Sequence, residues 1–89
     1  MQAIMTKYRG PTNSRGSRIV ATCDAARRTV PYDHALNLDG NHAAAARALA
    51  SALGWTGEYV GGTLPTGDMA WVWTPSHNPD ARPSFSVAA

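Results

Sequence analysis

The 89-residue sequence predicts a small α+β domain in which an antiparallel sheet has one helix packed on a face. Two observations predict this class. Five short segments have the alternating or β-branched composition of strands, and turn-forming Gly, Pro and Asp residues separate them. One alanine-rich segment, typical of a helix, stands between the third and the fourth of these. The predicted order is therefore β-β-β-α-β-β, in a single domain over residues 1–74.

The first three strands are expected at residues 3–8, 17–23 and 28–32. The first two alternate with period two, as strands with one buried face do. Gly10 and Pro11 end the first strand, and the turn-forming residues TNSRG lead into the second. Because Pro31 has no amide proton to donate, the third strand is expected at an edge or an end of the sheet.

The helix is expected from Asn41 to Leu53, where alanine, the best helix former, dominates. Small and apolar side chains recur along one stripe, which consists of Ala46, Leu49, Ala50 and Leu53. Asp39 or Asn41 is suited to cap the start of the helix. Gly54 is placed to adopt the left-handed conformation after its end, with Trp55 as the accompanying hydrophobic contact. An alanine stripe allows close approach, so a flat sheet is its natural partner.

The last two strands are expected at residues 58–64 and 69–74, joined by a hairpin turn at 65–68. In the second of them Met69, Trp71 and Trp73 share a face. That face either lies in the core under the helix or forms an exposed aromatic surface for stacking bases or for anchoring a protein. Residues 75–89 contain three prolines and show no periodicity, which predicts an irregular tail.

Charge is distributed unevenly along the chain, although the net charge is only +2. Residues 1–30 contain six basic residues and one Asp, whereas residues 31–89 contain two Arg and five acidic residues. This asymmetry predicts an anionic partner for the first third of the chain. Solubility of an exposed strand face is the other explanation. The candidate contact residues are Lys7, Arg9, Arg15, Arg18, Arg27 and Arg28.

The segment TNSRGSR, residues 12–18, combines two arginines with glycine, hydroxyl and amide groups that can all donate to phosphate. It contains neither a Walker motif nor a GxGxxG motif that opens a helix. We therefore interpret it as a hairpin connection whose arginines contribute to a contact surface. It is not expected to hydrolyse nucleotides.

Two catalytic arrangements compete with this binding role. Asp33, His34 and His42 invite comparison with a metal-dependent HNH-like nuclease, but the residue one turn beyond His42 is Ala46 and supplies no ligand. Cys23 with His34 and Asp33 could form a nucleophilic site, yet Cys23 shares its strand face with apolar residues and is expected to be a core thiol. The chain is therefore not expected to be an enzyme, and no metal or cofactor is expected.

The sequence also bears on the cellular setting. A single cysteine excludes an internal disulfide and fits a reducing compartment. The first residues lack the apolar region of a signal peptide, and no apolar stretch is long enough to span a membrane. We expect a cytoplasmic protein with no membrane partner. Its small core and open strand edges leave a homodimer or a structural, dimerising role as an alternative.

The segments MQAI, TKY, TNSRGSR, YDHALN, NH and LGW occur in this order. Together they resemble a set of small uncharacterised accessory proteins encoded by bacteriophages, prophages and other mobile elements of bacteria, over residues 1 to about 74. The resemblance implies a cofactor-free protein of the bacterial cytoplasm that binds a host or phage macromolecule. Inhibitors of bacterial defence systems, anti-CRISPR proteins among them, are similar in size and in lacking an active site.

The expected function is therefore to bind and occlude a nucleic acid or a host nucleoprotein through the basic N-terminal hairpin. If the target is a protein, the expected anchors are Trp71, Trp73 or Tyr59. Whether nucleic acid or protein is the direct partner stays open at this point. The alternatives are a small metal-dependent nuclease and a dimerising module.

Overall fold

The computed structural model describes residues 3–10, 16–74 and 84–87. It confirms the predicted α+β class and the order of its first six elements. The elements are β1 (Ile4–Arg9), β2 (Arg18–Thr22), β3 (Arg27–Pro31), α1 (Leu38–Ala52), β4 (Gly57–Thr63), β5 (Met69–Thr74) and β6 (Ser84–Val87).

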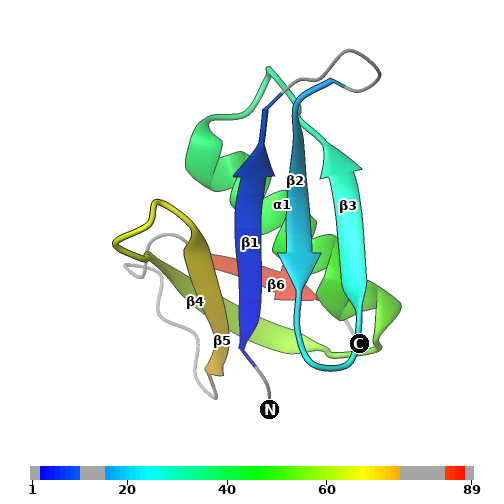
Figure 1. Cartoon of the computed structure of the whole chain (residues 1–89). Coiled ribbons are helices and arrows are strands. Elements are labelled where there is room, and N and C mark those ends of the chain that lie inside the picture. Colours follow the sequence, from blue (N-terminus) through cyan, green and yellow to red (C-terminus); the bar gives the residue numbers. More distant parts are fainter. Residues whose placement is uncertain (1–2, 11–15, 75–83, 88–89) are drawn as a thin grey trace.

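All neighbouring strands pair antiparallel in one sheet of order β3-β2-β1-β5-β4-β6. β3 is an edge strand, as Pro31 predicts. β1 joins the two halves of the sheet, but only Ile4, Met5 and Thr6 pair with β5. The second half of β1 pairs with β2 alone. The two halves therefore diverge beyond Thr6, and Figure 1 shows β1, β2 and β3 side by side with β4 and β5 turned away from them.

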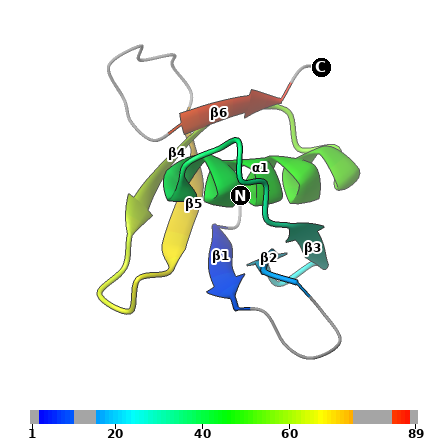
Figure 2. The same cartoon turned by 90° about the horizontal axis from the view of Figure 1, so that it is seen from above.

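The sheet curls around the helix. α1 contacts β1, β2 and β3 on one side and β6 on the other. Figure 2 shows α1 between these two ends of the sheet. One face of β1–β3 is thus covered by α1, and the other face is turned away from it.

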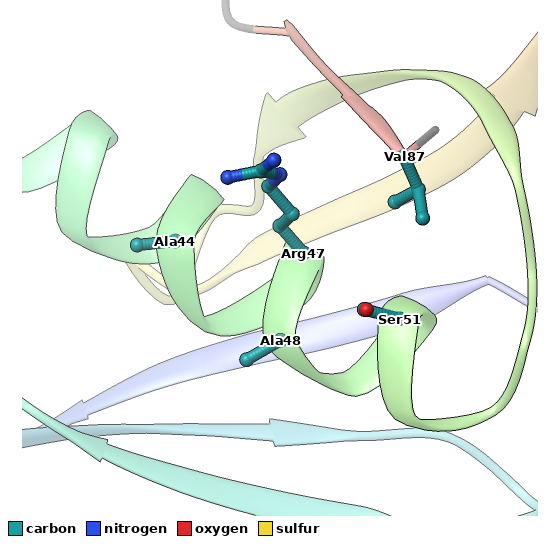
Figure 3. Close-up of a pocket in the computed structure, with 5 residues that line it drawn as sticks. All are labelled: Ala44, Arg47, Ala48, Ser51 and Val87. Atoms are coloured by element: carbon teal, nitrogen blue, oxygen red, sulfur yellow. The ribbon is translucent and has the colours of Figure 1, made fainter. Parts of the chain in front are cut away.

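Strand β6 corrects the prediction of an irregular tail for residues 84–87. Phe85 lies opposite Tyr59 in the β4–β6 pair, and the two rings stack with centroids 4.8 Å apart and planes 8° apart. From α1, Arg47 Nε donates to the Ser86 carbonyl oxygen at 3.1 Å. Figure 3 shows Arg47 near Val87. These long-range contacts stabilise a strand too short to be recognised by its alternation. The rest of the predicted tail, 75–83 and 88–89, lies outside the described residues.

The helix begins three residues before the predicted start. Asn37 caps it, with its side-chain oxygen accepting from the Gly40 amide at 2.7 Å, so neither Asp39 nor Asn41 is the cap. The buried Asn41 side chain instead accepts from the Asp33 amide at 2.7 Å and donates to the Asp33 carbonyl at 2.9 Å. These bonds attach the segment after β3 to the first turns of α1.

The end of α1 agrees with the prediction. Gly54 has φ +73° and donates its amide to Ser51 O at 3.1 Å. The Trp55 amide donates to Ala50 O at 2.9 Å. This pair of bonds is the Schellman arrangement, which satisfies carbonyls that the helix leaves free.

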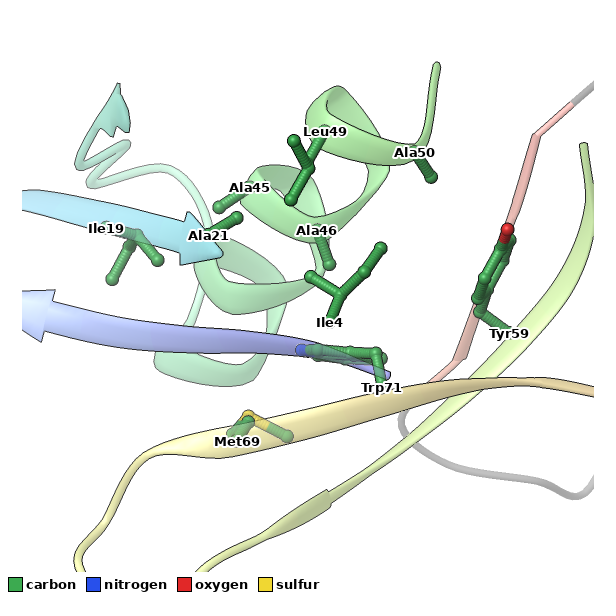
Figure 4. Packing of buried hydrophobic residues seen from close by; sticks show 10 residues of the cluster. All are labelled: Ile4, Ile19, Ala21, Ala45, Ala46, Leu49, Ala50, Tyr59, Met69 and Trp71. Carbon is green, nitrogen blue, oxygen red and sulfur yellow. The ribbon is translucent and has the colours of Figure 1, made fainter. Parts of the chain in front are cut away.

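The core lies between the alanine-lined stripe of α1 and the sheet (Figure 4). Its buried members from the helix are Ala45, Ala46, Leu49 and Ala50, and those from the sheet are Ile4, Ile19, Ala21, Tyr59, Met69 and Trp71. Small helix side chains allow the large Trp71 and Tyr59 rings to fit beneath them. A Cβ on Gly61 would lie 2.5 Å from Trp71 Cε3, so only glycine at this position leaves room for the indole.

Candidate functional site

The sheet face turned away from α1 carries most of the predicted basic residues. Lys7, Arg9 and Arg18 project from this face because Thr6 and Ile19, which adjoin Lys7 and Arg18, are buried against α1. Arg27 of β3 joins them because it lies opposite Thr22, which adjoins buried Ala21 on β2. These four cations border a shallow depression of about 390 Å³, which Val20, Thr22 and Thr29 complete. We call the seven residues the basic face.

The strand register brings the charges of the basic face close together. Arg9 lies directly opposite Arg18, and Lys7 lies opposite Val20. Thr22 lies opposite Arg27 in the next pair of strands. Arg18 Nη1 has a weak bond to the Gly16 carbonyl at 3.4 Å. Within residues 3–10, 16–74 and 84–87, no carboxylate pairs with these four cations. Their positive potential is therefore not neutralised locally by the described part of the protein.

Two of the six predicted basic residues are not part of this face as the structure describes it. Arg28 lies opposite Ala21, a residue buried against α1, so it projects to the other side of β3 from Arg27. Its side chain is exposed at the sheet edge. Arg15 lies outside the described residues.

The two tryptophans proposed as anchors have different environments. Trp71 is fully buried in the core and offers no surface to a partner, and the same holds for Tyr59, the third predicted anchor. Trp73 is 44% exposed at the end of β5. It shares the face of Trp71 rather than the basic face, and its ring lies against Gly57, where a Cβ would be 2.6 Å from Trp73 Nε1.

A second concave feature lies on the helix side of the sheet, beside the diverging end of β1. This cavity of about 510 Å³ is lined by Tyr8, Ser17, Tyr32, His34, Leu38, His42 and Gly67, and we call it the aromatic cavity. The Tyr8 and Tyr32 rings meet edge to face, with centroids 5.8 Å apart. The His34 ring lies 5.1 Å from that of Tyr32. Tyr8 OH donates to Ser17 Oγ at 3.1 Å.

His42 belongs to a buried chain of hydrogen bonds beneath the aromatic cavity. Trp71 Nε1 donates to Thr6 Oγ1 at 3.0 Å, and Thr6 Oγ1 lies 2.7 Å from His42 Nδ1. Because the indole N–H can only donate, the Thr6 hydroxyl oxygen accepts from Trp71, and the same hydroxyl links the indole to the His42 ring. Burial lowers the pKa of His42, although the charges of Asp39 and Asp68 and a hydrogen bond with the Thr6 backbone act in the opposite direction.

Of the residues of the nuclease alternative, His34 and His42 both line the aromatic cavity, whereas the Asp33 carboxylate bonds within its own segment. The Asp33 carboxylate accepts from the Ala35 amide at 2.9 Å, and His34 is exposed beside Tyr32. Among the described residues, no three His, Cys, Asp or Glu side chains lie close enough together to hold a metal ion. Cys23 packs against the core, as predicted, but it is half-buried rather than fully buried.

The aromatic cavity was not predicted from the sequence. Its residues come from β1, the residue before β2, the segment after β3, the first turns of α1 and the β4–β5 turn. One available signal was the alternation in β1, which puts Tyr8 on the same side as the buried Ile4 and Thr6.

Comparisons with protein-family models, with curated proteins and with solved structures find no match for this chain. In the part of the chain that the structure describes, no helix has the length and apolar character needed to cross a membrane.

Proposed function

We propose that this protein binds the phosphate backbone of nucleic acid through the basic face and acts by occlusion, without catalysis. The observation that carries the proposal is the opposition of Arg9 and Arg18, flanked by Lys7 and Arg27, on a sheet face where no described carboxylate pairs with them. Like charges directly opposite in a sheet are destabilising. An anionic partner would turn this local repulsion into attraction.

The geometry of the basic face suits a polyanion better than a single small anion. Neighbouring strands lie about 4.8 Å apart, and side chains two residues apart on one strand are separated by about 7 Å. The four cations span three strands, β1 to β3. Such an array can contact several phosphates, since a DNA duplex carries one charge per about 1.7 Å of its axis.

The resemblance to mobile-element accessory proteins supports a biological setting for this binding. In that setting we propose that the protein covers nucleic acid, or the nucleic-acid-binding surface of a host nucleoprotein, and so inhibits a bacterial defence complex in the manner of an anti-CRISPR protein. A host protein as the direct contact is the competing outcome of the experiment below.

The test measures how removal of arginines from the basic face changes the affinity for nucleic acid and its dependence on salt. Fluorescence anisotropy with a labelled duplex and a labelled single strand would be recorded over a range of salt concentrations. Arg9→Gln/Arg18→Gln is expected to weaken binding to every sequence and to reduce the slope of log K against log salt by about 2, because each arginine that neutralises a phosphate contributes about 1 to the slope.

Arg27→Gln and Arg28→Gln form the matched control pair, because these neighbours project from opposite sides of β3. We expect Arg27→Gln to make the slope of log K against log salt shallower and Arg28→Gln to leave this slope unchanged. Equal effects of the two substitutions would show that the net charge, rather than the basic face, governs binding. If the wild type binds no nucleic acid but captures a host protein that stays bound after nuclease treatment, then that protein, and not nucleic acid, is the direct partner.

A further inference from the structure

The aromatic cavity has walls suited to a flat ring. Tyr8 and Tyr32 form one corner in edge-to-face contact, and His34 extends the wall beyond Tyr32. Leu38 is 50% exposed and Tyr8 is 43% exposed, so apolar surface remains accessible there. A volume of about 510 Å³ is within the range of roughly 300–1,000 Å³ that ligand pockets have.

The His42 side chain supplies a directed polar group to this cavity. The residue is 1% exposed, and its Nδ1 is occupied by Thr6. Nε2 has no side-chain hydrogen bond within the described residues, and no buried side-chain nitrogen or oxygen there lacks a partner, so Nε2 borders accessible space. Because His42 lines the cavity, Nε2 is a polar ring atom available to a ligand there.

The aromatic cavity and the basic face meet at the same end of the β1–β2 pair. Tyr8 precedes Arg9 on β1, and Ser17 precedes Arg18 on β2. In each neighbouring pair the first side chain lines the cavity and the second belongs to the basic face. One end of two strands thus combines aromatic rings and a polar imidazole nitrogen with two guanidinium groups.

We infer that the aromatic cavity takes one unstacked nucleobase of a single-stranded nucleic acid whose phosphates lie on the basic face near Arg9 and Arg18. The ring stacks on Tyr32 or His34, and a polar atom on its edge forms a hydrogen bond with His42 Nε2. Bases have both the flat π-face and the edge donors and acceptors that these groups require. The inference rests on the proposed function and deepens it, since it specifies single strands over duplex.

The test uses a short single-stranded oligonucleotide and an abasic strand of the same length and charge. We expect the wild type to bind the base-bearing strand about tenfold to hundredfold more tightly, the range that stacking of one base produces. Tyr32→Ala and His34→Ala should reduce this ratio towards one without changing the affinity for the abasic strand. Trp73→Ala is the matched control, because it removes an exposed aromatic ring that does not line the cavity.

A second measurement uses only the wild type, so it does not depend on whether the variants fold. The imidazole ¹⁵N signal of His42 Nε2 should shift when the base-bearing strand is added, but not when the abasic strand is added. Together the two readouts separate the inference from the function on which it rests.

Equal binding of the two strands, with an unmoved His42 signal, would overturn the nucleobase site and leave the phosphate-binding function standing. Absence of binding to either strand would overturn both. A base preference that survives Tyr32→Ala and His34→Ala but disappears in Trp73→Ala would place the base outside the aromatic cavity and contradict the inference.

Discussion

Arg9 and Arg18 lie directly opposite each other in the β1–β2 pair, on the sheet face turned away from α1. A strand pair is normally stabilised by complementary neighbours at such positions. Here two guanidinium groups share one site, with Lys7 and Arg27 nearby on the same face. Under the proposed function, this arrangement lowers the stability of the free protein and raises its affinity for phosphate.

Replacement of Arg18 by Thr should therefore stabilise the free protein while weakening nucleic-acid binding. Thr removes the like charge opposite Arg9 and has a high preference for strands. We expect the free energy of unfolding to rise by about 0.2–1 kcal/mol at low salt, with a smaller gain at high salt. Urea denaturation at two salt concentrations measures this. A loss of stability at low salt would show that Arg18 has a structural role instead.

Gly61→Ala should destabilise the core. The added Cβ would lie 2.5 Å from the Trp71 ring, which is fully buried and cannot move away without repacking. We expect a loss of about 1–3 kcal/mol in the free energy of unfolding, measured by urea denaturation. Gly62→Ala, where an added Cβ meets nothing within 4 Å, is the control and should have a much smaller effect. Similar losses for the two variants would argue against the tight Gly61–Trp71 contact.

Phe85→Ala should show whether β6 contributes to stability. The substitution removes a ring that stacks on Tyr59 and lies 5.4 Å from the Trp71 ring. Because Phe85 is only partly buried, we expect a loss of about 2 kcal/mol, below the roughly 3–5 kcal/mol of a fully buried Phe. Ser86→Ala keeps the carbonyl that accepts from Arg47 and should be nearly neutral. Thermal unfolding of both variants gives the comparison, and an unchanged Tm for Phe85→Ala would contradict the packing of β6.

Stability should decrease as the pH falls below about 6.5, the ordinary pKa of histidine. Burial lowers the pKa of His42 in the native state, despite the opposing charges of Asp39 and Asp68. The unfolded chain therefore binds more protons than the native state in the window below 6.5, and protonation favours unfolding. Above that pH the contribution of neutral His42 is fully present, and it is lost as the pH falls through the native pKa.

The measurement is the urea midpoint of the wild type, His42→Gln and His34→Gln between about pH 7.5 and about pH 5. We expect His42→Gln to flatten the pH dependence, whatever its effect at neutral pH. His34→Gln should retain the wild-type slope, because exposed His34 lies outside the Trp71–Thr6–His42 chain. A wild-type slope in His42→Gln would assign the pH dependence to another group.

Local patterns predicted the elements that depend on local chemistry. Alternation located β1 and β2, the alanine stripe located the buried side of α1, and Gly54 marked the helix end. The predicted start of α1 was too late because Gly40 interrupts the alanine-rich pattern. In the structure the Gly40 amide donates to the Asn37 side chain, and this cap lets the helix begin before Gly40. Strand β6 was missed because its four residues are held by Phe85 and by Arg47, which is distant in sequence.

The candidate site was predictable only in part, for similar reasons. A count of charges identifies the basic first third, but register decides that Arg27 joins the basic face and Arg28 does not. Alternation puts Trp71 and Trp73 on one face but does not indicate that the strand end leaves only Trp73 exposed. The aromatic cavity assembles residues from five separate segments, so no single stretch of sequence indicates it.

The salt dependence of nucleic-acid binding by the wild type tests the central claim most directly. If Lys7, Arg9, Arg18 and Arg27 each contact one phosphate, log K for a duplex should fall against log salt with a slope of roughly −3.6, and for a single strand with a slope of roughly −2.8. Slopes near these values would support the basic face as the contact surface. Binding with a slope near zero, or no binding at low salt, would contradict it.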